Sequence, residues 1–277
     1  MERDERRELL SLPGFRSKGG LILRKMPEDE VPFAYFEDEI PSESQRKKIL
    51  RRGYGLSLNV IPAEHLDLKF LADFSGLTRL SIISLDATAQ RVVDLPELIE
   101  LHLLTEENGP VDLFRLPRLR VFSGSLEGNE SVFGAPAIQE IFLEETDGRA
   151  IPTIPDQLEN LTVTGARGVR ELVPRGAAPF LRTLAIYDTP SFDLASLVQF
   201  PRLRFVYLDG VRKVVISSSL ADFSAKTLSF INCGSVRDPE RLAEIEGAEI
   251  FVMGKKDKAL RSIAAVSPSR WEFSGRP

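Results

Sequence analysis

Few side chains in this sequence can support redox, metal or nucleophilic chemistry. Its 277 residues include a single cysteine, Cys233, so no internal disulfide can form and the fold does not depend on an oxidising compartment. The two histidines, His65 and His102, stand apart from each other and from the cysteine, which leaves no zinc-ligand spacing and no catalytic triad. We therefore expect a non-catalytic protein with no catalytic residue, no cofactor and no metal.

Long apolar runs are also missing. No stretch approaches the ~20 apolar residues that span a bilayer, and the first segment, MERDERRELL, is charged where a signal peptide would have an apolar core. The net charge of −5 favours solubility and argues against a protein that coats nucleic acid. We expect a cytoplasmic protein that does not bind membranes.

A short apolar pattern recurs along most of the chain. An apolar residue is followed three places later by a second and two places after that by a third, as in Leu98-Leu101-Leu103 and Leu181-Leu184-Ile186. The step between copies is 19 to 23 residues. The copies begin at Leu77, Leu98, Leu119, Ile138, Leu158, Leu181, Leu203, Ala225 and Gly247. With these copies the chain resembles the leucine-rich repeat family, in its short-repeat forms, over about residues 54–255.

This resemblance implies an α/β leucine-rich repeat solenoid, a horseshoe with a curved parallel β-sheet on its concave face and irregular or short helical convex segments. Strand geometry supports it independently, because alternating apolar residues give a short strand that buries one face only when copies stack beside it. Many members of the family carry Asn or Cys five residues after the middle apolar residue. Only Cys233 conforms here, so we expect that ladder to be largely absent and the solenoid to be irregular.

The two ends differ from the repeats and are predicted to be caps. Residues 1–53 form an N-terminal cap, with a hairpin of residues 21–26 and 32–36 and a short helix that begins after Ser42 and ends near Gly53. Residues 54–255 form a solenoid of about 9–10 repeats. Residues 256–277 form a C-terminal cap, in which a helix over residues 257–266 is followed by Trp271 and Phe273 packed over the last repeat.

The positions between the apolar residues of each strand should point outward on the concave face. Aromatic residues gather there in the later repeats, interspersed with carboxylates. Exposed aromatics on a rigid sheet are common anchors of protein interfaces, and carboxylates around them favour a basic or mixed-charge partner. The predicted partner-binding residues are Glu140, Phe142, Glu144, Tyr187, Phe205, Tyr207, Asp209, Phe251 and Met253. The alternative is that convex loops or neighbouring repeats pack over these rings.

These features favour a non-catalytic scaffold that binds a protein partner. A narrower hypothesis is a bacterial immunity protein that blocks a toxin enzyme, because inhibition requires only a surface. One alternative is nucleic-acid binding through the basic segment 46–52, joined by arginines of the repeats (Arg115, Arg118, Arg120, Arg202 and Arg204). Another is regulation of a nucleotide hydrolase by Arg167, Arg170 or Arg175. The basic segment can also be a solvated cap helix with acidic neighbours.

Overall fold

The computed structural model describes residues 10–25, 30–37, 39–60, 68–84, 89–105, 110–144, 146, 148–177, 179–254 and 271–274. The chain separates into two compact units, residues 1–138 (unit 1) and residues 139–277 (unit 2). This division lies inside the predicted solenoid, and the cap boundaries near residues 53 and 255 stay predictions. His65 and the helix predicted over residues 257–266 lie outside the described residues.

Unit 1 begins with an antiparallel hairpin and continues as a parallel sheet. The predicted pairing of the first apolar segments is present as β2 with β3, and an additional strand, β1, pairs with β2. From β3 onward the strands are parallel. The strands are β1 (Phe15–Lys18), β2 (Leu21–Arg24), β3 (Phe33–Glu37), β4 (Gly55–Val60), β5 (Arg79–Ser84), β6 (Glu100–Thr105) and β7 (Val121–Gly124).

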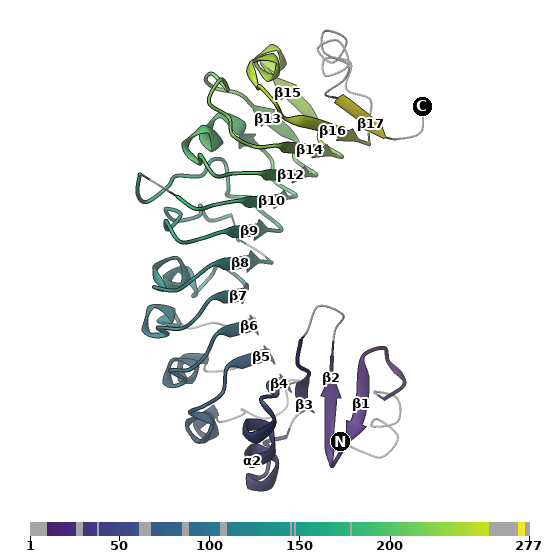
Figure 1. The fold of residues 1–277 in the computed structure, drawn as a ribbon, viewed down its shortest axis with the longest axis vertical. Helices are drawn as coiled ribbons and strands as arrows, with labels where there is room; N and C mark the ends of the chain where they lie inside the picture. The colour runs from purple at the N-terminus through teal and green to yellow at the C-terminus, as the bar shows by residue number, and fades with distance from the viewer. Residues whose placement is uncertain are drawn as a thin grey trace. The chain divides into compact units, whose positions relative to one another are not determined.

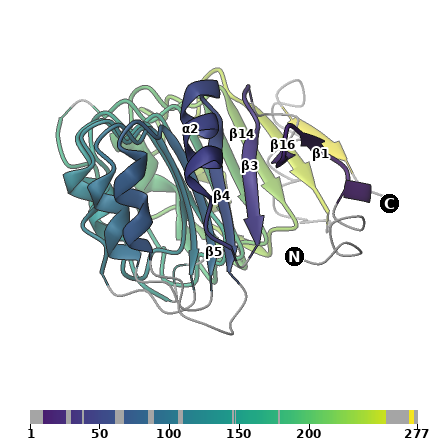
Figure 2. The ribbon, with the colours of Figure 1, turned by 90° about the horizontal axis from the view of Figure 1, so that it is seen from below.

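Among the described residues of unit 1, four of the connections contain a short 3-10 helix, and the connection between β3 and β4 contains an α-helix. The 3-10 helices are η1 (Leu68–Phe74), η2 (Ala89–Asp94), η3 (Leu113–Arg115) and η4 (Glu130–Gly134), which lie together on one side of the strands (Figure 1). The α-helix, α2 (Glu43–Arg52), begins after Ser42, whose side chain and backbone form a capping box with Gln45, and ends at the left-handed Gly53. In Figure 2, which shows the ribbon from below, α2 leads into β4.

Unit 2 contains two parallel sheets. The main strands are β8 (Glu140–Leu143), β9 (Asn160–Val163), β10 (Thr183–Tyr187), β12 (Phe205–Asp209), β14 (Thr227–Ile231), β16 (Glu249–Met253) and β17 (Trp271–Ser274). A second sheet of β11 (Phe192–Asp193), β13 (Lys213–Val215) and β15 (Ser235–Arg237) lies among the connections, with η5 (Leu194–Gln199) and η6 (Pro239–Glu244). Neither this second sheet nor the strand β17 was predicted from the sequence.

The strand register confirms the repeat pattern within each unit. In unit 1 the middle apolar residues stand opposite one another in the order Leu56, Leu80, Leu101 and Phe122. In unit 2 the order is Ile141, Leu161, Leu184, Val206, Leu228 and Ile250. All ten side chains are at most 2% exposed, so each column is a continuous core. The fold is a leucine-rich repeat solenoid.

The last repeat departs from the pattern at its first place. Gly247 is exposed and has a φ of 76°, whereas the following residue, Ala248, is buried. Trp271 and Phe273, which were predicted to pack over this repeat, belong to β17, whose backbone pairs with β16 in parallel register. The side chains of these two residues lie outside the described part of the chain.

Threonine hydroxyls take two of the places at which other family members have Asn or Cys. Thr146 Oγ1 donates a hydrogen bond to the Gly165 carbonyl at 3.2 Å, and Thr189 Oγ1 donates to the Val169 carbonyl at 3.0 Å. Cys233 Sγ contacts the Leu208 carbonyl at 3.2 Å. The Asn and Cys ladder is largely absent, as predicted, but a hydroxyl can also donate to a turn carbonyl, and the ladder function is therefore partly retained.

Left-handed residues follow the strands of unit 2 at a regular step. They are Gly165, Asp188, Gly210, Asn232 and Gly254, with φ between 48° and 100°. Glycines alternate with Asp or Asn in this series. The Asp188 side chain lies over the next repeat at Gly210, where a glycine leaves room for it. A Cβ atom on Gly210 would be 2.5 Å from Asp188 Oδ1, so a side chain there would displace this carboxylate, and the left-handed backbone conformation also favours glycine.

Candidate protein-interaction surface

The outer face of unit 2 is the strand face opposite to the core columns. Its side chains form rows across the strands, because residues at equal places in successive repeats are paired. The first row is Glu140, Asn160, Thr183, Phe205, Thr227 and Glu249. The middle row is Phe142, Thr162, Ala185, Tyr207, Ser229, Phe251 and Glu272. The third row is Tyr187, Asp209, Ile231 and Met253.

The structure places eight of the nine predicted partner-binding residues in these rows, and the ninth, Glu144, directly follows β8. Three large apolar side chains are open to solvent: Phe142 is 41% exposed, Phe205 is 40% exposed and Met253 is 46% exposed. The rings of Tyr207 and Phe251 are partly exposed. Apolar side chains gathered in this way on a face are typical of interaction surfaces. That they bind a partner stays a prediction.

The outer face of unit 2 carries acidic side chains without basic ones. The three rows and Glu144 contain five carboxylates, Glu140, Glu144, Asp209, Glu249 and Glu272, and neither lysine nor arginine. Asp209 is held in place by Asn232, whose Nδ2 donates to Asp209 Oδ1 at 3.2 Å. A face of one charge sign attracts partners of the opposite sign and speeds their association.

Basic residues lie instead at the edge where the strands of unit 2 begin. Arg182, Arg204 and Lys226 are exposed and stand in successive repeats, because Arg204 N donates to the Arg182 carbonyl and Lys226 N donates to the Arg204 carbonyl. Arg182 pairs with Glu159 at 3.3 Å. Arg202 lies over the ring of Phe180, with its guanidinium carbon 3.7 Å from the ring centroid. Cations are thus present beside the acidic face but outside its rows.

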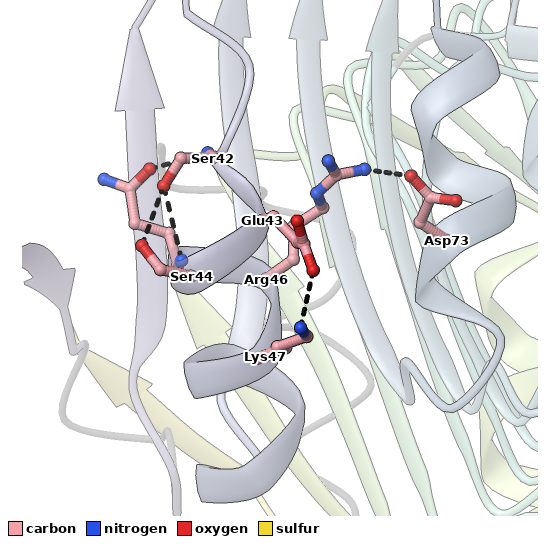
Figure 3. Close-up of polar contacts among 7 residues, drawn as sticks. Ser42, Glu43, Ser44, Arg46, Lys47 and Asp73 are labelled. Carbon is pink, nitrogen blue, oxygen red and sulfur yellow. Dashed lines mark hydrogen bonds and ion pairs between the residues drawn. The ribbon is translucent and has the colours of Figure 1, made fainter.

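Three cations of the basic segment 46–52, Arg46, Lys47 and Lys48, make contacts inside unit 1. Figure 3 shows the ion pairs of Arg46 with Asp73 in η1 and of Lys47 with Glu43, the latter 2.5 Å long. Lys48 Nζ donates to the Gly19 carbonyl. Arg51 and Arg52 lie in the last turn of α2, where cations stabilise the helix dipole. These contacts fit the cap-helix interpretation of the segment better than nucleic-acid binding.

A polar cluster on the outer face of unit 1 was not predicted. Arg79 Nε and Nη2 contact the two carboxylate oxygens of Glu100 at 2.5 and 3.1 Å, and His102 Nε2 lies 2.7 Å from Glu100 Oε1. The Arg79 guanidinium also covers the Phe33 ring at 4.3 Å from its centroid. His102, interpreted from the sequence as isolated, is therefore part of a network. The sequence signal that could have predicted this network is the opposite charges of Arg79 and Glu100 at equal places in adjacent repeats.

This network changes the acidity of Glu100. Burial by itself would raise the pKa of the carboxyl, but the hydrogen bonds from His102 and Arg79 outweigh it and lower the pKa to about 2. Room for the network comes from Gly55, since a Cβ atom there would lie 2.5 Å from the Phe33 ring. The cluster joins β3 of the hairpin region to β5 and β6, so its arrangement indicates a structural role in holding these strands together.

Cys233 has the properties of a structural residue. Burial raises the pKa of its thiol to about 11, against the smaller lowering effect of backbone hydrogen bonds near Val211 and Ile231.

Among the described residues, no three His, Cys, Asp or Glu side chains are grouped so that they could hold a metal ion. Within the same part of the chain, no helix has both the length and the apolar character that crossing a membrane requires.

Comparisons with known proteins find likeness only at the level of structure. No family model matches the chain, and no curated protein matches it. The functional domain of InlJ from Listeria monocytogenes, which includes a cysteine ladder, is 18% identical with a TM-score of 0.49, over 79% of this chain and 48% of that chain. TLR13, in a complex with ssRNA13, is 11% identical with a TM-score of 0.42, over 86% of this chain and 46% of that chain.

This chain thus spans about half the length of the two solved chains. At such low identity and TM-scores, the fold assignment rests on the strand register of the chain itself. No ligand or activity is transferred from either structure.

Proposed function

We propose that this chain is a protein-interaction module that binds a basic or mixed-charge protein partner on the outer face of unit 2. The observation that carries the proposal is the combination of exposed Phe142, Phe205 and Met253 with five carboxylates and no cation in the three rows and at Glu144. Aromatic side chains bury much area at low entropic cost when they are bound. The surrounding carboxylates then select a partner of positive charge.

The narrower form of the proposal is a bacterial, cytoplasmic immunity protein that neutralises a toxin enzyme. Its support is chemical: blocking an enzyme needs a rigid surface and no catalytic group, and a nuclease-like target that contacts phosphates has a basic surface. The acidic rows of unit 2 are complementary to such a surface. Purified toxin enzymes from the same genome would then lose activity on addition of this chain in equal molar amount.

Affinity capture from the native cells, repeated with variants, tests the proposal. We expect Phe205→Ala and Tyr207→Ala each to weaken retention of a partner that the unchanged chain retains in stoichiometric amount. Phe114→Ala is the matched control, because Phe114 is a 61% exposed phenylalanine on η3, away from the strands. Retention that Phe205→Ala and Tyr207→Ala leave unchanged would place the binding surface elsewhere and contradict the proposal.

The exposed cations at the strand edge favour a second candidate, the binding of an anionic polymer such as nucleic acid. Arg204 and Lys226 are exposed in adjacent repeats, next to the Arg182–Glu159 pair. A salt-dependent gel shift that Arg204→Gln and Lys226→Gln abolish would support this candidate. The hypothesis of nucleotide-hydrolase regulation concerns Arg167, Arg170 and Arg175, which are exposed in the connection between β9 and β10. Hydrolysis by a candidate GTPase that their replacement leaves unchanged would remove that hypothesis.

A further inference from the structure

Ser229 lies at the centre of a block of nine outward positions on three adjacent strands of unit 2. In the middle row Tyr207 precedes it on β12 and Phe251 follows it on β16. Ser229 is 6% exposed, whereas the two rings are partly exposed. Within the rows described above, no other small residue has an aromatic ring on both sides. The other positions of the block are Phe205, Thr227, Glu249, Asp209, Ile231 and Met253.

The spacing of the strands that carry the two rings leaves room for a planar group. Neighbouring strands lie about 4.8 Å apart, so Tyr207 and Phe251 are separated by about 10 Å of backbone, with the small serine between them. A flat group that touches a ring on each face needs about 3.5 Å on each side. A planar group would touch both rings if each side chain leaned about 1.5 Å toward it. Among protein side chains, arginine has a guanidinium group that is planar and stacks readily on aromatic faces.

The carboxylates around Ser229 favour a cation at the same position. Asp209 and Glu249 occupy opposite corners of the block, each about 8 Å from Ser229 between Cα atoms, and the other two corners, Phe205 and Met253, are apolar. Asp209 Oδ1 accepts a hydrogen bond from Asn232 Nδ2 at 3.2 Å, which fixes the carboxylate at the third row. No lysine or arginine stands among the nine positions. The block thus presents two rings, two carboxylates and no competing cation.

We propose that an arginine side chain of the basic protein partner inserts over Ser229, with its guanidinium between the rings of Tyr207 and Phe251 and its N–H groups directed to Asp209 and Glu249. This inference rests on the proposed function and specifies the chemical group that the face recognises. Arginine is preferred to lysine because it combines ring stacking with several fixed donors, whereas an ammonium is a compact, strongly hydrated charge.

The test uses N-acetyl-arginine amide as the probe and nuclear magnetic resonance of the intact chain as the readout. We expect the probe to shift the Ser229 amide and the ring signals of Tyr207 and Phe251 in a saturable way. N-acetyl-citrulline amide, which has nearly the same shape without the charge, shifts none of them. Tyr207→Leu keeps an apolar side chain but removes the ring, and we expect it to weaken arginine binding about fivefold.

Ser229→Leu fills the central position and abolishes the shifts. Its matched control is Ser81→Leu, because Ser81 is an equally buried outward serine of unit 1 whose strand neighbours are Ser57 and His102. Asp209→Asn combined with Glu249→Gln provides a second variant that leaves the packing intact and reduces the affinity for the probe. Shifts that citrulline produces equally, or that Ser229→Leu leaves unchanged, overturn the arginine assignment.

The capture experiment separates this inference from the proposed function. If the Phe205→Ala variant loses the partner and the Ser229→Leu variant retains it, the result supports the interaction surface and contradicts the proposed arginine position over Ser229. Specific shifts with the arginine probe, combined with no retained partner, support the guanidinium position and contradict the proposed function.

Discussion

Arg79 and Glu100 stand directly opposite each other on β5 and β6, and the arginine reaches both carboxylate oxygens. The same carboxylate accepts a contact from His102 in its own strand, and the same guanidinium covers Phe33 from the hairpin. Two oppositely charged residues in adjacent repeats thereby connect the first strands of the solenoid to the segment that precedes it. Because Glu100 is mostly buried, its contribution to stability should be measurable.

We expect the Glu100 network to make stability depend on pH. The folded-state pKa of Glu100 is lowered from 4.5 to about 2, so its contribution is complete above pH 4.5 and is lost as the pH falls through 2. The shift corresponds to about 3 kcal/mol at neutral pH. Glu100→Gln should lower the free energy of unfolding by about 2–3 kcal/mol at pH 7. Urea titrations should show this difference narrowing at pH 3, and a difference that stays constant would contradict the assignment.

A side chain at Gly210 should displace the Asp188 carboxylate and strain the backbone. The φ of 68° at this glycine disfavours other residues, and a Cβ atom would lie 2.5 Å from Asp188 Oδ1. We expect Gly210→Ala to lower the free energy of unfolding by about 2 kcal/mol, as measured by urea denaturation. Gly148→Ala is the control, because Gly148 has a φ of 76° with no atom near its missing Cβ, and it should cost about 1 kcal/mol. Equal losses in the two variants would show that the Asp188 contact is unimportant.

The repeat period was sufficient to predict the core columns, because one register shift would move every apolar residue to the outer face. Leu101 and Leu184 could therefore be placed from the sequence, and so could the outward positions of Phe205 and Tyr207. The second sheet was missed although Phe192, Val214 and Val236 share a step of 22 residues. One apolar residue per repeat, within segments of varying composition, is too weak a strand signal in isolation.

The Glu100 network was missed for a different reason. The register alone brings Arg79 next to Glu100, but the burial of the pair depends on Phe33 and on the missing side chain of Gly55. Those residues belong to the hairpin region and the first strand, and their place relative to β5 is a tertiary feature. The hydrogen bonds of Thr146 and Thr189 to turn carbonyls were not predicted, because the family pattern has only Asn or Cys at these places.

Cys233 should react slowly in the folded protein. Its thiol pKa of about 11 leaves very little thiolate at pH 8, and thiolate is the nucleophilic form. We expect reaction with a disulfide reagent at pH 8 to be at least about tenfold slower in buffer than in denaturant, where the thiol returns to its ordinary pKa of about 8.5. The absorbance of the released thiol gives both rates. Fast labelling of the folded chain would reveal an accessible, activated cysteine and contradict the structural role.

The acidic rows of unit 2 should control how fast the partner associates. We expect the association rate with the captured partner to fall as salt is raised from about 0.05 M to 0.5 M, since exposed charges are then screened within a few ångströms. Glu140→Gln combined with Glu249→Gln should slow association at low salt and reduce the salt dependence, with a smaller effect on dissociation. Glu240→Gln is the matched control, because Glu240 is an exposed carboxylate on η6, outside the strands. An association rate that is independent of salt, or equally slowed by Glu240→Gln, would show that these rows do not guide the encounter.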